Sequence, residues 1–304
     1  MTVRITDSMV SRTILSDLGA ADRRLALTQR RISSGKQLTR PSDDPFGVDR
    51  AMQLRSELEA TRQFRRNVNE GSGWTTATEA ALTRITDVLQ RARELLVAGG
   101  NDSNGPVARE AIATEIDALT ESLKQEANAT YGGRYVFAGT ATETTPYELG
   151  GADVYAGNAG TVARVIGAGV SVAINVSAQG LLGNGQGAAD NKLLDVMRDL
   201  AENLRGGTAA DAEALRGTDL QRLDINLDEL TRVRAVVGAM ANRLEAAGTR
   251  LDELEESGID LLSKVEDADM AETLVQYATQ KSAYESALHA GANIVQTSLL
   301  DFLH

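Results

Sequence analysis

The chain has 304 residues, of which 43 are acidic and 31 basic, giving a formal net charge of −12. It has no cysteine and two histidines, which excludes disulfides, iron–sulfur clusters and thiol nucleophiles and leaves little for a histidine metal site or a Ser-His-Asp triad. The acidic balance disfavours nucleic-acid binding. No apolar run approaches the roughly 20 residues of a membrane span, and the N-terminus lacks the apolar stretch of a secretory signal peptide.

The first arm of the chain has the period of an amphipathic helix. Apolar residues recur every three or four positions from Ile14 to Ile32, and the stripe stops at Ser33-Ser34-Gly35, a helix-ending sequence. Asp44 followed by Pro45 predicts a second helix, with Asp44 as its N-cap. A further ladder of Leu and Ile runs from Leu82 to Leu96 before a glycine pair. The first 131 residues are therefore predicted to be helical.

The second arm repeats this pattern after residue 190. A stripe from Leu220 to Leu251 keeps heptad spacing, with Arg234 at one skipped position, and predicts a coiled-coil-like helix of roughly 40 residues. The last helix carries a stripe that includes Leu274, Leu288, Val295, Leu299 and Phe302.

The segment 132–189 has a different composition from both arms. It holds 13 of the 28 glycines and five charged residues. Alternation over residues 170–176 predicts a half-buried strand, and residues 134–137 and 162–166 are further strand candidates.

These patterns predict a mainly α fold with a small β insert. Both arms form a long antiparallel coiled-coil-like helical bundle, and the middle forms a β-rich domain. We predict five segments. Residues 1–40 form an N-terminal axial helix that is disordered in the monomer, and residues 41–131 form the first half of a helical rod. Residues 132–189 form a small outer domain, residues 190–263 the second half of the rod, and residues 264–304 a C-terminal axial helix.

The net charge is unevenly distributed along the chain. Residues 1–66 carry 13 basic and 8 acidic side chains, whereas residues 245–272 carry 10 acidic and 2 basic ones. Opposite signs at the two ends predict that the arms meet, within one chain or between copies, although two solvated faces that never touch would give the same pattern.

No group of residues argues for catalysis, a cofactor or a metal ion. Asp43 and Asp44 fit helix capping better than cation binding, and Glu266, Asp267 and Asp269 fit the start of the last helix. The glycines of GNGQG lack the spacing of a phosphate-binding loop. The chain is therefore expected not to be an enzyme.

The terminal stripes instead predict assembly. Such faces, rich in small residues, are stabilising when other helices pack closely against them, so we expect the two ends to pack on one another and on copies of the chain. The positions predicted for axial packing are Ile14, Leu18, Leu25, Ile32, Leu274, Leu288, Val295, Leu299 and Phe302.

Two separate segments resemble the bacterial flagellin superfamily. RISSGKQLTRPSDDPFG at 31–47 is similar to the N-terminal motif of flagellins and their hook-associated relatives, and 264–303 resembles the flagellin C-terminal helix, from its EDAD start to its SLL end. VGAMANRLE at 237–245 resembles the segment upstream of that helix. Within the superfamily, GGRYVFAGTATETTPY at 132–147 and the β module at 155–177 resemble the hook–filament junction branch.

This resemblance implies a structural role in an extracellular appendage. It implies export through the flagellar type III apparatus without a cleaved signal, and a cytoplasmic chaperone before export. It further implies self-assembly into a ring between the first hook-associated protein and the flagellin filament, with the terminal helices forming the inner tube. Two alternatives stay open: a filament flagellin with a reduced outer domain, and a surface adhesin on a coiled-coil stalk.

Overall fold

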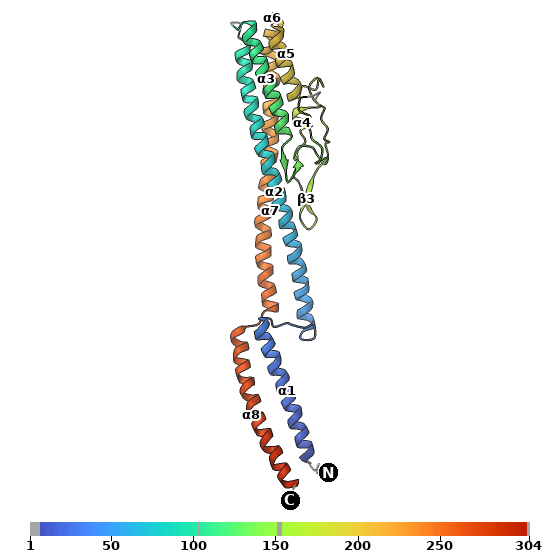
Figure 1. Ribbon diagram of the computed structural model, residues 1–304, viewed down its shortest axis with the longest axis vertical. Helices are drawn as coiled ribbons and strands as arrows, with labels where there is room; N and C mark the ends of the chain where they lie inside the picture. The colour runs from blue at the N-terminus through green and yellow to red at the C-terminus, as the bar shows by residue number, and fades with distance from the viewer. Residues whose placement is uncertain (1–6, 102–103, 151–153, 303–304) are drawn as a thin grey trace. The chain divides into compact units, whose positions relative to one another are not determined.

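The computed structural model describes residues 7–101, 104–150 and 154–302 (Figure 1). The elements in these ranges are α1 (Asp7–Ser34), α2 (Pro45–Gly99), α3 (Pro106–Ala127), β1 (Thr130–Tyr131), β2 (Arg134–Tyr135), β3 (Ala163–Gly167), β4 (Val170–Ala173), α4 (Gln179–Leu182), α5 (Leu193–Gly206), α6 (Ala209–Ala214), the π-helical turn η1 (Leu215–Asp219), α7 (Leu220–Glu266) and α8 (Met270–Phe302). None of the helices in these ranges has a stretch apolar and long enough to cross a membrane.

Long-range contacts divide the chain into two compact units. The first, which we call the terminal unit, comprises residues 1–60 and 254–304; the second, the bundle unit, comprises residues 61–253. Helices α2 and α7 contribute to both, because they are 55 and 47 residues long. The predicted mainly α fold with a small β insert is confirmed.

The bundle unit is built on an antiparallel pair made by α2 and α7. Ion pairs fix the direction, because Arg65 lies 3.5 Å from Asp252 while Arg93, further along α2, lies 2.8 Å from Asp224. The buried face of α7 repeats every seven residues, through Leu223, Leu230, Val237, Leu244 and Leu251. This period places one residue per two turns against the partner helix, as in a coiled coil, and it confirms the predicted heptad stripe.

The skipped heptad position is explained by an ion pair. Arg234 reaches across to Glu79 on α2, with 2.7 Å between Nη2 and Oε1, and its Nη1 lies 3.3 Å from the hydroxyl of Thr86. A charged residue at this position is tolerated because its guanidinium meets a carboxylate at the partially exposed edge of the pair rather than the apolar seam.

Helices α3 and α5 pack against one another beside this pair. Helix α5 has buried apolar residues along most of its length, among them Leu193, Leu194, Met197, Leu200 and Leu204. Helix α6 begins with a capping box, in which Thr208 and Asp211 each accept the other's backbone amide. The bundle is therefore held by one continuous apolar core rather than by a single helix pair.

The glycine-rich insert contains two short hairpins. Tyr131 pairs with Arg134 across Gly132 and Gly133, whose positive φ values of 57° and 78° suit a two-residue hairpin turn. The second hairpin pairs β3 with β4 and contains a bulge between Val165 and Gly167. Strands were predicted over 134–137, 162–166 and 170–176, but the observed strands are shorter at 134–135 and 170–173. Each ladder ends where the next amide is used elsewhere: Ala129 donates to the carbonyl of Glu126, and Val162 donates to the side chain of Asn175.

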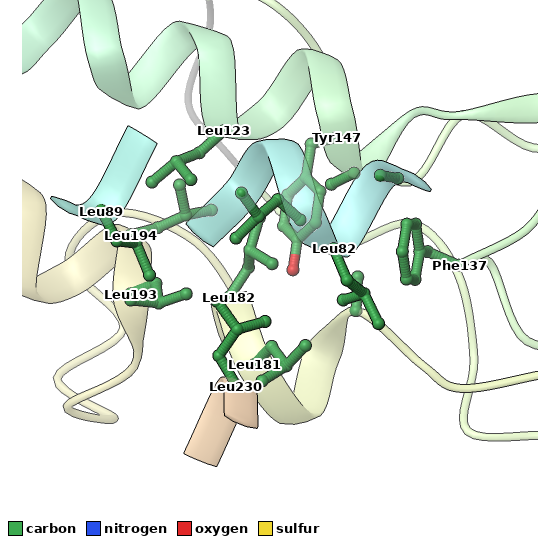
Figure 2. Packing of buried hydrophobic residues seen from close by; sticks show 14 of the residues in the cluster. Leu82, Leu89, Leu123, Phe137, Tyr147, Leu181, Leu182, Leu193, Leu194 and Leu230 are labelled. Carbon is green, nitrogen blue, oxygen red and sulfur yellow. The ribbon is translucent and has the colours of Figure 1, made fainter. Parts of the chain in front are cut away.

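Buried aromatic residues attach this insert to the bundle. Tyr147 is fully buried, and its hydroxyl donates to the Gly183 carbonyl at 2.6 Å. Figure 2 shows Tyr147 and Phe137 in one cluster with leucines of α2, α3, α4, α5 and α7. Asn128 bonds both backbone groups of Tyr147, at 2.7 and 3.0 Å. The insert is thus part of the bundle core and not a separate flexible module.

A glycine inside α2 allows the ring of Tyr131, in the first hairpin, to lie against that helix. A Cβ on Gly73 would lie 2.2 Å from the hydroxyl of Tyr131, so only glycine leaves room for that ring. Tyr131 also meets Trp74 edge to face, with the ring centroids 6.3 Å apart. Trp74 is 2% exposed, so its indole ring packs inside the core.

Candidate assembly surface

The terminal unit contains an antiparallel pair formed by α1 and α8, which lie side by side in Figure 1. Near one end the buried hydroxyl of Thr28 lies 2.8 Å from Oε1 of Gln280. Towards the other end a Cβ on Gly291 would lie 3.1 Å from Cγ2 of Ile14. The predicted use of small residues for close helix approach is therefore observed at Gly291.

This pair leaves much of its apolar surface uncovered. Ile14, Leu18, Leu25 and Ile32 are half-buried, whereas Leu274 and Leu288 are 51% and 45% exposed. Further exposed apolar side chains are Met9, Leu15, Met270 and Val275. The remaining predicted axial positions, Val295, Leu299 and Phe302, lie outside the described side chains. Two helices alone can bury only the stripe where they meet, so the rest stays in contact with solvent.

A small hydrogen-bonded joint connects the two arms of the terminal unit. Gly35 ends α1 with a φ of +67°, and its carbonyl accepts the amide of Ala268 at 3.0 Å. The amide of Gln37 donates to the Glu266 carbonyl at 2.7 Å, so Lys36 and Asp267 face each other as a single antiparallel bridge. The chain segments before α2 and before α8 are thereby fixed side by side.

Charged side chains reinforce this joint. Nζ of Lys36 lies 2.6 Å from Asp267 and 3.1 Å from the buried carboxylate of Glu266, which also accepts a hydrogen bond from Arg55. Hydrogen bonds to the two carboxylates raise the pKa of Lys36, and the bond from Lys36 lowers the pKa of Asp267. The basic first arm and the acidic second arm therefore meet within one chain, as their charges predicted.

The acidic residues Glu266, Asp267 and Asp269 were all predicted to start the last helix, and only one of them does so. Asp269 does start the last helix, because its Oδ1 accepts the amides of Ala271 and Glu272 at 2.9 and 3.1 Å. Glu266 and Asp267, in contrast, pair with residues more than 200 positions away. The uneven charge of the sequence indicated a basic first arm and an acidic stretch before the last helix. No nearby sequence feature could show that Glu266 and Asp267 pair with Lys36 and Arg55.

The turn after the joint is organised by the two aspartates of the RPSDDPFG sequence. Asp43 Oδ2 accepts the amide of Arg40 and the hydroxyl of Thr39, both at 2.9 Å, and these bonds, chiefly the one from Thr39, lower the pKa of Asp43. Asp44 Oδ1 accepts the amide of Phe46 at 3.1 Å, which confirms its capping role. No group of three potential metal ligands occurs among the residues that the structure describes.

We expect the joint to weaken in acid and in strong alkali. The pKa of Asp267 is lowered on folding, so its contribution is present above the unfolded value of about 4 and is lost as pH falls through the folded one. The pKa of Lys36 is raised, so its contribution is present below about 10.4 and is lost as pH rises through the folded value.

Carboxyl carbon chemical shifts of Asp267, followed from pH 7 downwards, measure the acid branch directly. Lys36→Met should move the midpoint of Asp267 upwards, towards the ordinary value. Lys264→Met is the matched control, because Lys264 pairs with Asp260 within α7 and its loss should leave the midpoint unchanged. Equal shifts in both variants would contradict the assignment.

Both helical arms are similar to known protein families. Residues 5–142 match the model of the bacterial flagellin N-terminal helical region, and residues 220–303 match that of the C-terminal helical region. Flagellar hook-associated protein 3 of Escherichia coli (strain K12) is 27% identical over 286 residues, covering 88% of this chain and 89% of that protein. The flagellin of Bacillus subtilis (strain 168) is 26% identical and covers 99% of this chain and 100% of its own length.

A solved structure shares the fold. The flagellar hook-associated protein 3 of Legionella pneumophila superposes with a TM-score of 0.61 at 16% identity, over 70% of this chain and 98% of that one. The two matched family regions coincide with the arms that build α1 to α3 and α7 to α8. The chain is accordingly a structural, non-enzymatic component of the bacterial flagellum, and it belongs to the bacterial flagellin family.

Proposed function

We propose that this chain is a hook–filament junction protein, which assembles by packing its terminal helices on copies of itself and on neighbouring axial proteins. The observation that carries the proposal is the uncovered apolar stripe of the α1–α8 pair, with Leu15 69% and Val275 67% exposed. An apolar surface of this extent favours a partner. Similarity to hook-associated protein 3 over most of both chains supports placing that partner at the junction.

The axial residues belong to the same proposal. Ile14, Leu18, Leu25 and Ile32 on α1, with Leu274, Leu288, Val295, Leu299 and Phe302 on α8, are the positions that we assign to packing in the tube. On the hook side the partner is the first hook-associated protein, and on the filament side it is flagellin. A cytoplasmic chaperone covers the C-terminal region before export through the type III apparatus.

Immunogold labelling of isolated flagella tests this position. A junction protein should give a single band where the hook meets the filament. Deletion of its gene should leave hooks that release flagellin monomers into the medium. Labelling along the whole filament, with hooks and filaments still joined in the deletion strain, would contradict the proposal.

A filament flagellin with a reduced outer domain is the second candidate. The alignment with the Bacillus subtilis flagellin, which leaves almost no part of either chain uncovered, favours it. The labelling experiment separates the two, because a flagellin would label the length of the filament.

The adhesin alternative loses its binding surface. Carbohydrate recognition would need exposed aromatic rings in the insert, yet Phe137, Tyr147 and Tyr155 are 1%, 0% and 8% exposed. The hydroxyl groups of the two tyrosines are engaged as well, since Tyr147 donates to the carbonyl of Gly183 at 2.6 Å and Tyr155 donates to the carbonyl of Phe137 at 2.8 Å. Tyr135, the fourth aromatic residue of the insert, is half-buried, and its hydroxyl accepts a hydrogen bond from Thr145 at 3.0 Å. Three of these four aromatic residues therefore serve the core.

A further inference from the structure

One face of α1 forms an open groove with an apolar floor and a cationic rim. Ala26 and Leu27 lie in it beside Gln29 and Ser33, and the guanidinium groups come from Arg23, Arg30 and Arg40. The volume of this space is about 790 Å³. We call it the arginine groove. Arg23 and Arg30 are seven residues apart, so they lie on the same side of the helix, two turns from one another.

The cations of the arginine groove have no ionic partner among the described residues. Residues 23–40 contain six basic side chains and no acidic one. Lys36 is used by the joint, whereas Arg23, Arg30 and Arg40 are exposed and form no ion pair within the described ranges. The carboxylate of Asp43, which Arg30 influences from a distance, is already bonded to Thr39 and to the backbone of Arg40.

A complementary acidic face lies on α7. Residues 251–263 contain five acidic side chains and no basic one. Asp252 and Asp260 are paired with Arg65 and Lys264. Glu253 and Glu256 are exposed and make no ion pair or side-chain hydrogen bond within the described residues. They lie one turn apart on the same side of a continuous helix.

We propose that the arginine groove of one copy receives the Glu253–Glu256 face of α7 from a neighbouring copy. This contact rests on the proposed self-assembly, and it would orient neighbouring copies head to tail. Because the two faces differ, one copy can offer its groove to one neighbour and its acidic face to another, and repeating that head-to-tail contact produces an extended or ring-shaped array. Guanidinium groups bond carboxylates with a forked, directional geometry, and charge pairing of this kind fixes register and excludes wrong pairings.

Charge exchange provides the first test, on chains expressed as the only copy in cells and assayed in isolated flagella. Arg23→Glu with Arg30→Glu should lower incorporation about tenfold or more, as should Glu253→Arg with Glu256→Arg, since each places like charges together. A chain carrying all four changes should regain incorporation, because both faces are reversed together. Arg24→Glu, outside the arginine groove, is the matched control and should incorporate normally. Circular dichroism melting of the purified chains checks that each variant folds.

Engineered cysteines provide the second test, and the absence of natural cysteine makes it specific. Ser33 lines the arginine groove, and Ser257 lies one turn from Glu253 on α7. Flagella that carry Ser33→Cys and Ser257→Cys together should yield disulfide-linked multimers on oxidation. Chains with either change alone should stay largely monomeric, as should the control pair Ser33→Cys and Ser282→Cys.

The outcomes separate this contact from the proposed function. A labelled band at the hook–filament boundary without cross-links, and without rescue by the fourfold variant, would overturn the contact and leave the junction role standing. Equal loss in both double variants and in the fourfold variant would overturn it too. Labelling along the filament together with rescue and cross-links would overturn the junction position but support the contact.

Discussion

A chain that lacks residues 293–304 is expected to fold in its bundle unit and to lose assembly entirely. The deleted segment ends α8, and the described apolar core of the bundle unit is formed by residues between Val68 and Leu251. Its removal shortens the α1–α8 pair and takes away three proposed axial positions, so the array loses contacts that recur in every copy. Cells with this chain as the only copy should be non-motile.

Two measurements check this expectation, one on the purified chain and one on the culture. The melting temperature of the bundle should match that of the full chain, and secreted protein should appear in the medium rather than on flagella. The point variant Leu288→Glu should reproduce the defect in a chain of full length, whereas His289→Glu, at the next exposed position, should not. Normal filaments on cells that carry only the shortened chain would refute the proposed role of the terminal helices.

Phe137→Ala is expected to give a large loss of stability for a single change in the insert. Phe137 is 1% exposed, and its carbonyl accepts hydrogen bonds from Ala178 and Tyr155 at 3.1 and 2.8 Å. Truncation of a fully buried phenylalanine leaves a cavity and costs about 3–5 kcal/mol of unfolding free energy. Urea denaturation followed by circular dichroism and by Trp74 fluorescence measures the loss.

The same substitution at an exposed site provides the control. Phe46 is 89% exposed at the start of α2, so Phe46→Ala should change the unfolding free energy by less than about 0.5 kcal/mol. A small effect at Phe137, or equal effects at both positions, would mean that the insert is not part of the bundle core.

The helices were predictable because their cause is local. The seven-residue recurrence of leucines in α7, and the signals Ser33-Ser34-Gly35 and Asp44-Pro45, determine where helices run and end without reference to the rest of the chain. The structure confirms these features and extends the predicted helix of roughly 40 residues to 47. The half-buried strand expected at 170–176 is shorter, because the amide of Val162 donates to the side chain of Asn175 at 2.8 Å instead of continuing the ladder with a backbone carbonyl.

The candidate site was less predictable, because its contacts join distant parts of the chain. Glu266 is separated from Lys36 by 230 positions and from Arg55 by 211, and neither the type nor the spacing of these residues marks them as partners. The arginine groove has the same origin: Arg40 joins Arg23 and Arg30 there only because the turn after α1 folds back. The opposite net charges of the two arms predicted that they attract one another. Only the three-dimensional structure shows which residues form the pairs.

The heptad seam of α7 has a mechanical consequence. A straight α-helix drifts by about 20° per seven residues, so a seam that returns every seven residues from Leu223 to Leu251 winds its pair into a left-handed supercoil. A left-handed coil tightens when it is twisted in one sense and loosens when it is twisted in the other. In a rotating appendage this pair would therefore resist the two senses of rotation unequally, with the difference set by the handedness of its leucine seam.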